Sequence, residues 1–556
     1  MTRAWWLILA AAWGCGSTPL EADPDATTSG TSGTTGTTSG ESSGVVPTSG
    51  DVPGTGSASG SESGESGESS ESGESGESSG TTGEDGVGPR YNEVRQKSAH
   101  NSFQRDEAIV DMIAVHRVRS LEFDVHVGKT LEDDVAGDWY VYHTDIVDDD
   151  SQCRTLSVCL GVVASAATVL PEHEVVTLWV DLKDGFADGH RPADLDALIE
   201  AAFGERLLTP GELVAGCPGA TSVQGAVVDC GWPLLMEMRG RVMVALTGGG
   251  AELGEYVGGD ANGRAAFVAP ALAGDFVGHP EAAIINLEAG DVAVATAARA
   301  AGLVSRVWVL DDSGAWDAAV AAGAHHLASN KVNAWQDAWA TTTSAGGWPF
   351  TCIDACDMPD RELGAVLRVD VDSGDLWNDS DDAVFVHWPV ADGAVAVTGL
   401  LGAVSSHVEP FIKGCVGGRV GVAADAAYLA VCRPADDEPP RVQVRAAAGE
   451  ETEEVLMDGV DGLAAELPAF AKFERSADGE CAVGYGSADG VGWSKIAERC
   501  FDAAISHVGV MASANDAGAA QVRMFGLTAT PGGSLLAADA ATELLGGAAG
   551  GAGDDW

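Results

Sequence analysis

Basic residues are scarce in this 556-residue chain. It contains 30 Lys and Arg residues against 84 Asp and Glu residues, which gives a formal net charge of −54 at pH 7. A charge of this sign repels the phosphates of nucleic acid and the surface of an anionic bilayer. We therefore exclude nucleic-acid binding, and we expect no adhesion of the folded part to an anionic membrane.

The chain also lacks a long hydrophobic run. Its opening, MTRAWWLILAAAWGCGS, holds one Arg and an apolar stretch too short to span a bilayer as a helix, which is the layout of a secretory signal over residues 1–14. AAWGC resembles a bacterial lipobox, with Gly14 before the cysteine and Ala12 at minus three. Cleavage there makes Cys15 a lipidated N-terminus. We expect export and a lipid anchor at the bacterial cell envelope or surface, and the alternative is a secreted protein cleaved elsewhere.

Aromatic and basic residues are absent between residues 16 and 89. This stretch is rich in Ser, Gly, Thr and Glu, with SGE repeating in ESGESGESSESGESGESS. Such a composition cannot bury a core and predicts disorder. Residues 15–89 are therefore predicted to be a lipidated cysteine and a disordered tether.

No cysteine pair has the CxxC spacing of a zinc knuckle, so metal binding by thiolates is not expected. Without Cys15, ten of the eleven cysteines remain, and an even number in an exported chain predicts disulfides. The cysteines form five couples that are local in sequence, but the sequence leaves their connectivity open. The couples are 153/159, 217/230, 352/356, 415/432 and 481/500.

Strand-like and helix-like segments alternate between residues 94 and 331. The eight strand-like runs are VRQKSA, RSLEFDV, WYVYH, VVTLWVDLK, RVMVALT, AAIINLE, VSRVWVL and HHLAS. Amphipathic segments lie between some of them, such as RPADLDALIEAAFGERL. This pattern predicts an α/β fold, a (β/α)₈ TIM barrel over residues 90–345.

Chemistry in such a barrel is placed at the C-terminal ends of the strands. Polar and ionisable residues fall there in the first four predicted strands: His100, Asn101, Glu122, Asp124, His143, Asp181 and Lys183. Residues two apart on a strand share a face, so the carboxylates of Glu122 and Asp124 lie together. Asp181 and Lys183 are related in the same way.

Four of these residues offer only oxygen to a metal. They are Asn101, Glu122, Asp124 and Asp181. Oxygen ligands suit a hard cation, and a carboxamide among them favours calcium over magnesium. A capped turn or a rim salt bridge is the more common role of any single Asp or Glu, but all four residues fall at the same end of successive strands. The sequence therefore predicts calcium.

SAHNSF, SLEFDVHVG, YVYH and LWVDLKD, in this order, resemble the X-type barrel of phosphoinositide-specific phospholipase C, in particular its secreted, calcium-dependent bacterial branch. The resemblance implies that His100 and His143 are the catalytic histidines and that the four oxygen residues bind calcium. Asp181 stands where the family usually has Glu.

In that family the inositol 2-hydroxyl attacks the phosphorus of a phospholipid, which implies a cyclic inositol phosphate as product. A calcium-bound carboxylate would be the base, His100 would donate to the phosphoryl oxygens, and His143 would be the general acid. Lys183 would contact a substrate phosphate, or be a solvated lysine of the rim.

The end of the barrel, AARAAGLVSRVWVLDDSGAWDAAVAAGAHHLAS, also resembles glycerophosphodiester phosphodiesterase, which shares the barrel and the calcium carboxylates. That family normally has His-Arg where this chain has His100 and Asn101, so the Asn favours phospholipase C. Glycerophosphodiesters remain the alternative substrates. His325, His326 and Lys331 receive no role.

Residues 350–532 carry short alternating runs that predict a β-sandwich. YGSADGVGWSKI and HVGVMASANDAGAAQVRMFGL resemble concanavalin-like jelly rolls, which implies a possible glycan ligand, although Trp493 is equally compatible with the core. Residues 533–556, rich in Ala and Gly, are predicted to be a disordered tail. A surface glycan-binding lipoprotein with an inactive barrel is thus a further alternative function.

Overall fold

The structure is a computed structural model that covers most of the chain beyond its N-terminal segment. It describes residues 88–114, 116–130, 132, 135–334, 336–344, 347–359, 366–404, 412–434, 441–456, 470–487, 490–515, 520–535, 540–546, 548 and 550–555. The signal peptide predicted over 1–14, Cys15 and all but the last two residues of the tether lie outside the described residues and stay predictions. No helix within the described ranges is both long and apolar enough to cross a membrane.

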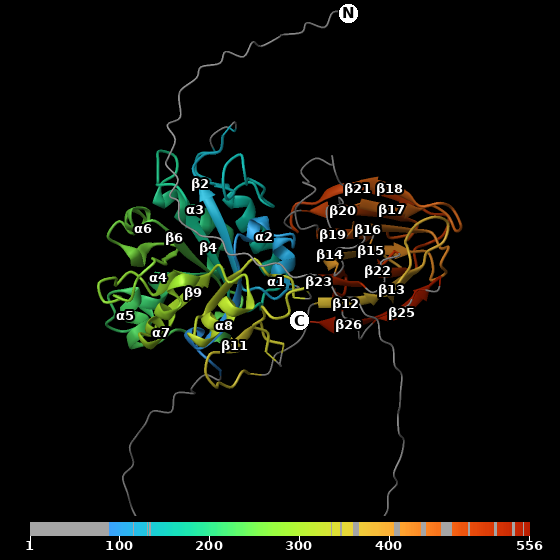
Figure 1. Cartoon of the computed structure of the whole chain (residues 1–556). Helices are drawn as coiled ribbons and strands as arrows, with labels where there is room; N and C mark the ends of the chain where they lie inside the picture. Colours follow the sequence, from blue (N-terminus) through green and yellow to red (C-terminus); the bar gives the residue numbers. More distant parts are fainter. Residues whose placement is uncertain are drawn as a thin grey trace, which may run out of the picture. The chain divides into compact units, whose positions relative to one another are not determined.

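Within the described residues, eight parallel strands form a ring of the TIM-barrel type (Figure 1). Hydrogen-bonded neighbours follow the order β7-β6-β4-β2-β1-β10-β9-β8. The backbone NH of Asn286 on β8 donates to the carbonyl of Pro270, just beyond β7, at 3.2 Å, so the two ends of this order meet. The predicted barrel is confirmed. Its strands are β1 (Val94–Ala99), β2 (Ser120–His126), β4 (Val176–Leu182), β6 (Val242–Gly248), β7 (Phe267–Val268), β8 (Ile284–Glu288), β9 (Val304–Trp308) and β10 (His326–Ser329).

One predicted barrel strand is wrong. Residues 139–143 form only the short strand β3 (Tyr140–Val141), which runs antiparallel to β2. Tyr140 pairs with His126, the last residue of β2, so β3 lies at the rim and outside the ring. The eighth place in the ring belongs to β7, whose two residues are too few to produce a periodic pattern in the sequence.

Helices surround the parallel strands (Figure 1). The α-helices are α1 (Ile109–Ala114), α2 (Leu156–Val169), α3 (Pro192–Phe203), α4 (Pro210–Ala215), α5 (Val223–Asp229), α6 (Gly250–Val257), α7 (Ala293–Ala300) and α8 (Ser313–Ala321). The 3₁₀ helices are η1 (Tyr91–Glu93), η2 (Ser102–Gln104), η3 (Gly204–Arg206), η4 (Leu235–Met238), η5 (Ala261–Gly263) and η6 (Ala289–Asp291), and a two-residue strand β5 (Leu207–Leu208) pairs with the start of β6. The amphipathic segment predicted at RPADLDALIEAAFGERL is confirmed as α3.

Helix α3 shows how the sequence sets these elements. Pro192 occupies the first turn, where a missing backbone NH is harmless, and the carboxylate of Asp194 accepts a hydrogen bond from the backbone NH of Arg191 at 2.8 Å. Gly204, with a φ of 50°, follows the last residue. The apolar residues recur every four positions, so one face of the helix is buried: Leu195, Ile199 and Phe203.

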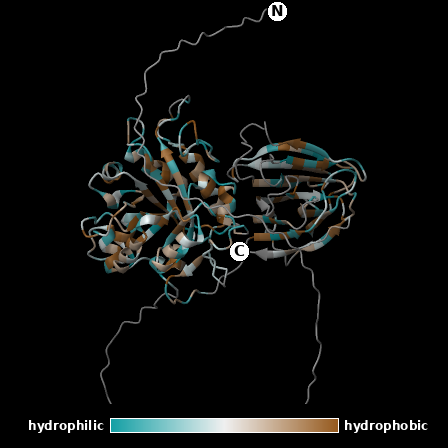
Figure 2. Ribbon diagram, in the orientation of Figure 1, coloured by the Kyte–Doolittle hydropathy of each residue, from teal (hydrophilic) through white to brown (hydrophobic). Residues whose placement is uncertain are grey.

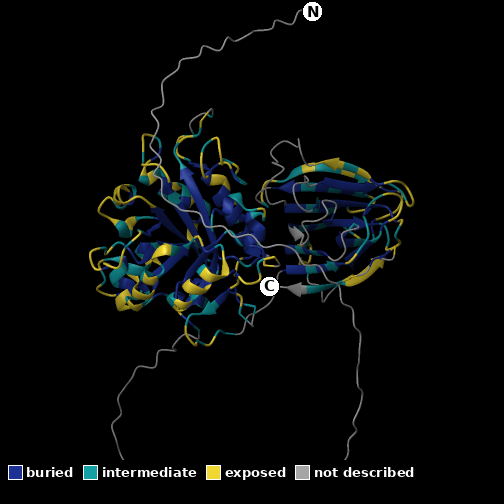
Figure 3. Cartoon of the chain, in the orientation of Figure 1, coloured by how far each residue is buried: buried dark blue, intermediate teal, exposed yellow. Residues whose placement is uncertain are grey.

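Strand β2 carries the alternation that builds the site. Its apolar residues are buried in the core shared with helices α1, α2 and α3: Leu121, Phe123 and Val125. Ser120, Glu122 and Asp124 alternate with them and face the inside of the ring, where they are also buried. Figure 2 shows that the barrel strands carry both hydrophilic and hydrophobic residues, and Figure 3 shows that the same strands are buried along their length.

The C-terminal part is a β-sandwich, as predicted. One antiparallel sheet has the order β21-β20-β19-β14-β23-β12-β26, and the other has the order β18-β17-β16-β15-β22-β13-β25. Apolar residues from both sheets form one core between them. The strands are β12 (Val366–Val371), β13 (Ala383–Pro389), β14 (Val395–Val404), β15 (Lys413–Arg419), β16 (Tyr428–Pro434), β17 (Arg441–Arg445), β18 (Glu453–Leu456), β19 (Phe470–Arg475), β20 (Cys481–Ser487), β21 (Ser494–Cys500), β22 (His507–Ser513) and β23 (Ala520–Thr530).

The predicted boundaries of the sandwich need two corrections. Strands β24 (Gly533–Ser534), β25 (Ala541–Leu545) and β26 (Gly550–Asp555) belong to its sheets, so the tail predicted to be disordered is in part folded. Its Ala and Gly residues hide the strands, because they lack the β-branched and aromatic side chains that mark one. At the other end, β11 (Phe350–Cys352) pairs with β1 and belongs to the barrel sheet.

The five disulfides join the predicted local couples. Cys415 and Cys432 face each other across β15 and β16, and Cys481 and Cys500 do so across β20 and β21. Disulfides are typical of proteins that fold in an oxidising compartment.

Candidate active site

His100 and Asn101 occupy the C-terminal end of β1. The backbone NH of His100 donates to the carbonyl of Ser329 at 3.0 Å, which extends the pairing of β1 with β10 by one residue. Asn101 then adopts a left-handed conformation, with φ 48° and ψ 58°, that Asn tolerates better than most residues. The chain turns there into η2. His100 thus closes the strand, and Asn101 turns the chain beside it.

Glu122 links this turn to the middle of the barrel. Its Oε2 accepts hydrogen bonds from the backbone NH of Asn101 at 3.0 Å and from Nη2 of Arg306 at 2.7 Å, and it lies 4.0 Å from Nε2 of His100. Burial tends to raise the pKa of Glu122, but Arg306, His100 and the backbone hydrogen bond lower it to about 2. The carboxylate is therefore ionised although it is buried.

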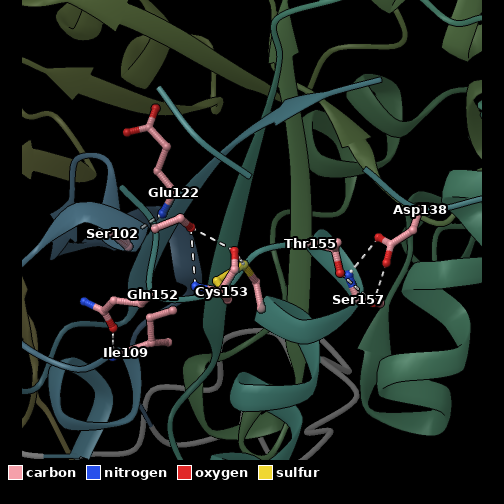
Figure 4. The surroundings of a disulfide bond; sticks show 10 residues. Ser102, Ile109, Glu122, Asp138, Gln152, Cys153, Thr155 and Ser157 are labelled. Atoms are coloured by element: carbon pink, nitrogen blue, oxygen red, sulfur yellow. Dashed lines mark hydrogen bonds between the residues drawn. A yellow bond between two sulfur atoms is a disulfide. The ribbon is translucent and has the colours of Figure 1, made fainter. Parts of the chain in front are cut away.

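The segment that follows Asn101 is fixed to β2 and to a disulfide (Figure 4). Ser102 Oγ accepts a hydrogen bond from the backbone NH of Glu122 at 2.9 Å. Gln152, next to Cys153 of the first disulfide, accepts a hydrogen bond from the backbone NH of Ile109 at 3.0 Å. These contacts fix the segment after Asn101 to β2 and to the loop that carries the first disulfide.

Asp124 and Asp181 are neighbours on β2 and β4, and Thr247 is the next residue in the same row on β6. Asp181 Oδ1 accepts a hydrogen bond from Thr247 Oγ1 at 2.7 Å. Nζ of Lys183 lies 3.1 Å from Asp124 Oδ2 and 2.5 Å from Asp181 Oδ2. The ammonium group of Lys183 thus bridges the two carboxylates.

Asp124 is the buried member of this row, with no exposed surface. Its Oδ1 has no hydrogen-bond donor among the described residues, and its Oδ2 meets only the ammonium group of Lys183, at 3.1 Å. Burial and the charge of Glu122 raise the pKa of Asp124 to about 8, although Lys183 opposes this effect. Burial lowers the pKa of Lys183, but Asp124 and Asp181 raise it above its ordinary value.

His143 follows β3 at the rim and does not end a barrel strand. Its Nδ1 lies 2.8 Å from Oδ2 of Asp148, and 41% of its side chain is exposed. Nε2 of Gln104, in η2, donates to Oδ1 of Asp148 at 2.8 Å. The chain of contacts from Asp148 to Gln104 therefore ties the segment of His143 to the turn after His100.

Several residues of the site were missed by the sequence reasoning. Arg306 on β9 is fully buried, donates to Glu122 and to Oδ1 of Asn286 at 3.2 Å, and lies 5.0 Å from the ring centre of Trp179. The ring of Trp308 stacks on the His100 imidazole with centroids 5.7 Å apart. The sequence held one signal for these residues. In VSRVWVL, Arg306 stands between apolar residues and two positions before Trp308, so the alternation of a strand sends both side chains to the same face, into the ring.

The two histidines without a predicted role belong to the core. Nδ1 of His325 accepts a hydrogen bond from the backbone NH of Ser305 at 3.1 Å, and His326 contacts the hydroxyl groups of Tyr91 and Ser120. Burial lowers the pKa of both imidazoles. His326 lies inside the ring beside Ser120 and Trp179, whereas His325, its neighbour in sequence, contacts backbone groups of Ser305 and Asn92.

The side-chain oxygens of Asn101, Glu122, Asp124 and Asp181 have the chemistry that a hard cation prefers. In their present positions, however, no three or more of the described His, Cys, Asp and Glu residues are grouped so that they could hold a metal ion. The fit rests on Asp124, whose buried Oδ1 has no hydrogen-bond donor among the described residues, with Asp181 beside it in the same row. A calcium ion between these carboxylates would displace the ammonium group of Lys183.

The family model described as phosphoinositide phospholipase C, Ca²⁺-dependent, matches residues 136–310. This match confirms the predicted resemblance over that part of the chain, which includes His143, Asp181 and Lys183. His100, Asn101, Glu122 and Asp124 precede the matched residues, so their assignment rests on the motifs and on the geometry described above.

Solved structures of similar proteins match part of this chain. A calcium-dependent phosphoinositol-specific phospholipase C from a Pseudomonas species is 24% identical and covers 47% of this chain and 95% of its own, with a TM-score of 0.42. A calcium-dependent phosphatidylinositol-specific phospholipase C from Streptomyces antibioticus is 19% identical and covers 43% of this chain and 94% of its own, with a TM-score of 0.36. A glycerophosphodiester phosphodiesterase from Thermotoga maritima is 12% identical and covers 43% of this chain and 96% of its own, with a TM-score of 0.26. No curated protein matches the chain.

Proposed function

We propose that the barrel is a calcium-dependent phosphodiesterase that cleaves the glycerol-phosphate ester of a phosphoinositide by attack of the inositol 2-hydroxyl. The observation that carries this proposal is the junction at Glu122, which brings the Asn101 turn within 3.0 Å and the His100 imidazole within 4.0 Å of one carboxylate. The match to the calcium-dependent phospholipase C family supports the same reaction.

Each step has a group of this chain to perform it. A carboxylate of the Glu122, Asp124 and Asp181 set takes the proton of the 2-hydroxyl as its oxygen forms a bond to phosphorus. His100 donates to a phosphoryl oxygen as negative charge grows there. The bond to the glycerol oxygen breaks, and His143 protonates that oxygen. The products are diacylglycerol and a cyclic inositol phosphate.

Calcium, held by Asn101, Glu122, Asp124 and Asp181, would supply positive charge that lowers the pKa of the hydroxyl and stabilises the phosphoryl oxygens. Lys183 contacts two of these carboxylates, Asp124 and Asp181. We propose that Lys183 turns to a substrate phosphate when the cation takes its place.

His143 suits the role of general acid. Its Nδ1 is engaged by the carboxylate of Asp148, so Nε2 is left to face the leaving group. The exposure of this side chain allows it to reach a substrate whose lipid part stays in a membrane.

The products formed from a panel of substrates test the proposal. We expect the full-length protein with calcium to release cyclic inositol phosphate from phosphatidylinositol. Glycerophosphoinositol and glycerophosphocholine complete the panel. If only these glycerol diesters are cleaved, with glycerol phosphate as product, the protein is a glycerophosphodiester phosphodiesterase. If no phosphodiester is cleaved, the barrel is inactive and glycan binding by the sandwich becomes the function to test.

We further propose that the protein acts outside the cytoplasm, held to a membrane through lipidated Cys15. The five disulfides support an oxidising compartment, and the lipobox-like AAWGC supports the anchor. The net charge of −54 argues against attachment to an anionic bilayer through the protein surface.

A further inference from the structure

The imidazole of His100 has a second partner that the sequence reasoning did not consider. Its Nδ1 lies 3.1 Å from Oδ1 of Asn330, the residue that directly follows β10. Only 16% of the His100 side chain is exposed, and the ring is stacked on Trp308. The imidazole is therefore held in one orientation, with Nδ1 toward Asn330 and Nε2 on the side of Glu122.

Asp311 fixes which way the Asn330 amide faces. Its Oδ2 accepts a hydrogen bond from Nδ2 of Asn330 at 2.9 Å. Its Oδ1 accepts from the backbone NH of Asn330 at 2.6 Å and from Oγ of Ser329 at 3.1 Å. An ionised carboxylate can only accept hydrogen bonds, so the NH₂ group of Asn330 must face Asp311 and its carbonyl oxygen must face His100.

This arrangement determines the tautomer of His100. A carbonyl oxygen accepts and cannot donate, so Nδ1 must carry the proton. We infer that Asp311 and Asn330 are positioning residues that keep a proton on Nδ1 of His100, so that the neutral ring is the Nδ1-protonated tautomer and the imidazolium form donates to a phosphoryl oxygen from Nε2. The inference rests on the proposed function only for what Nε2 does. The tautomer itself follows from the hydrogen bonds.

Exchange of the two polar residues gives a sharp test. Asn330→Ala removes the acceptor. In the double variant Asn330→Asp/Asp311→Asn the new carboxylate at 330 accepts from Nδ1 of His100 and from the new amide at 311, so the order of donors and acceptors is preserved. Asn262→Ala is the matched control, because the Asn262 side chain donates to the carbonyl of Thr221 and has no part in this chain of contacts.

The first readout is the tautomer, measured by nitrogen NMR of the full-length protein labelled in histidine, at one alkaline pH where imidazoles are neutral. The His100 signal is assigned by its loss in His100→Gln. We expect the proton on Nδ1 in the native protein, in the exchanged variant and in the control, and a mixture of tautomers in Asn330→Ala. A proton on Nε2 in the native protein, or an unchanged tautomer in Asn330→Ala, would overturn the inference.

The second readout is catalysis of phosphatidylinositol cleavage. Loss of an outer partner of a working group typically lowers activity about 10- to 100-fold. We expect Asn330→Ala to lower kcat by about this factor with little change in KM, and the exchanged variant to recover most of it. If the tautomer is as inferred and the native protein cleaves no phosphoinositide, the proposed function fails and the inference about His100 stands.

Discussion

Replacement of Arg306 by Met tests the electrostatic design of the barrel interior. The Arg306 side chain has no exposed surface, and its Nη2 lies 2.7 Å from the Glu122 carboxylate. Loss of one partner of a buried ion pair destabilises proteins by about 3 to 5 kcal/mol, because the other charge remains buried and unpaired. Arg306 is the largest of the interactions that together lower the Glu122 pKa from 4.5 to about 2 against the opposing effect of burial, so its loss removes the main compensation for this buried charge.

The effect should depend on pH in a defined direction. The folded pKa of Glu122 is below its ordinary value, so ionised Glu122 stabilises the native protein above about pH 4, and this contribution is lost as the pH falls toward 2. Without Arg306, burial raises the pKa of Glu122. We therefore expect the loss of stability in Arg306→Met to be largest at neutral pH and smaller at pH 4.

Urea unfolding of the full-length protein with a chelator measures this loss. The α-helices of the described residues all lie in the barrel, so helical circular dichroism reports on the barrel. Arg191→Met is the matched control, because it removes an exposed pair with Asp188 whose contribution should be below about 1 kcal/mol. Glu122→Gln added to Arg306→Met should restore part of the stability. Equal, small effects of the two Arg variants would refute the reasoning.

Three further predictions concern the site and the anchor. His100→Ala or His143→Ala should lower turnover by about 10²- to 10⁴-fold and leave calcium binding in calorimetry intact, and unchanged turnover in both would contradict their roles. Asn101→Asp should retain calcium-dependent cleavage, whereas Asn101→Arg should weaken calcium binding by placing a cation beside the metal, so equal calcium affinity in both would remove Asn101 from the ligand set. Cys15→Ser should release the protein from membranes without changing turnover on a soluble substrate, and sedimentation with membranes after a salt wash would point to the sandwich as the anchor.

Much of the barrel could be predicted because its strands and helices are periodic. Strand β4 is mostly apolar and carries Asp181 just before its last residue, Leu182, and helix α3 repeats apolar residues every four positions. The short strands could not be found in this way. β7 has two residues and no pattern, and β26 consists largely of Gly and Ala, so its pairing with β12 is decided by the partner strand and not by its own propensity.

The candidate site was predicted where residues follow one another on a strand, and missed where they meet across the ring. Glu122 and Asp124 were placed together by period two alone. Arg306 reaches Glu122 from a strand 184 residues away in sequence, and Asn330 reaches His100 across 230 residues. Such contacts depend on the closure of the barrel, which a local pattern does not encode.

Release of cyclic inositol phosphate from phosphatidylinositol tests the central claim most directly. The full-length protein is assayed with calcium, after chelation, and after calcium is restored, with His100→Ala as the inactive reference. We predict cleavage with calcium, loss of cleavage on chelation and recovery on addition, and at most residual product from His100→Ala. Equal cleavage with and without the chelator, or no cyclic product under any condition, would contradict the account.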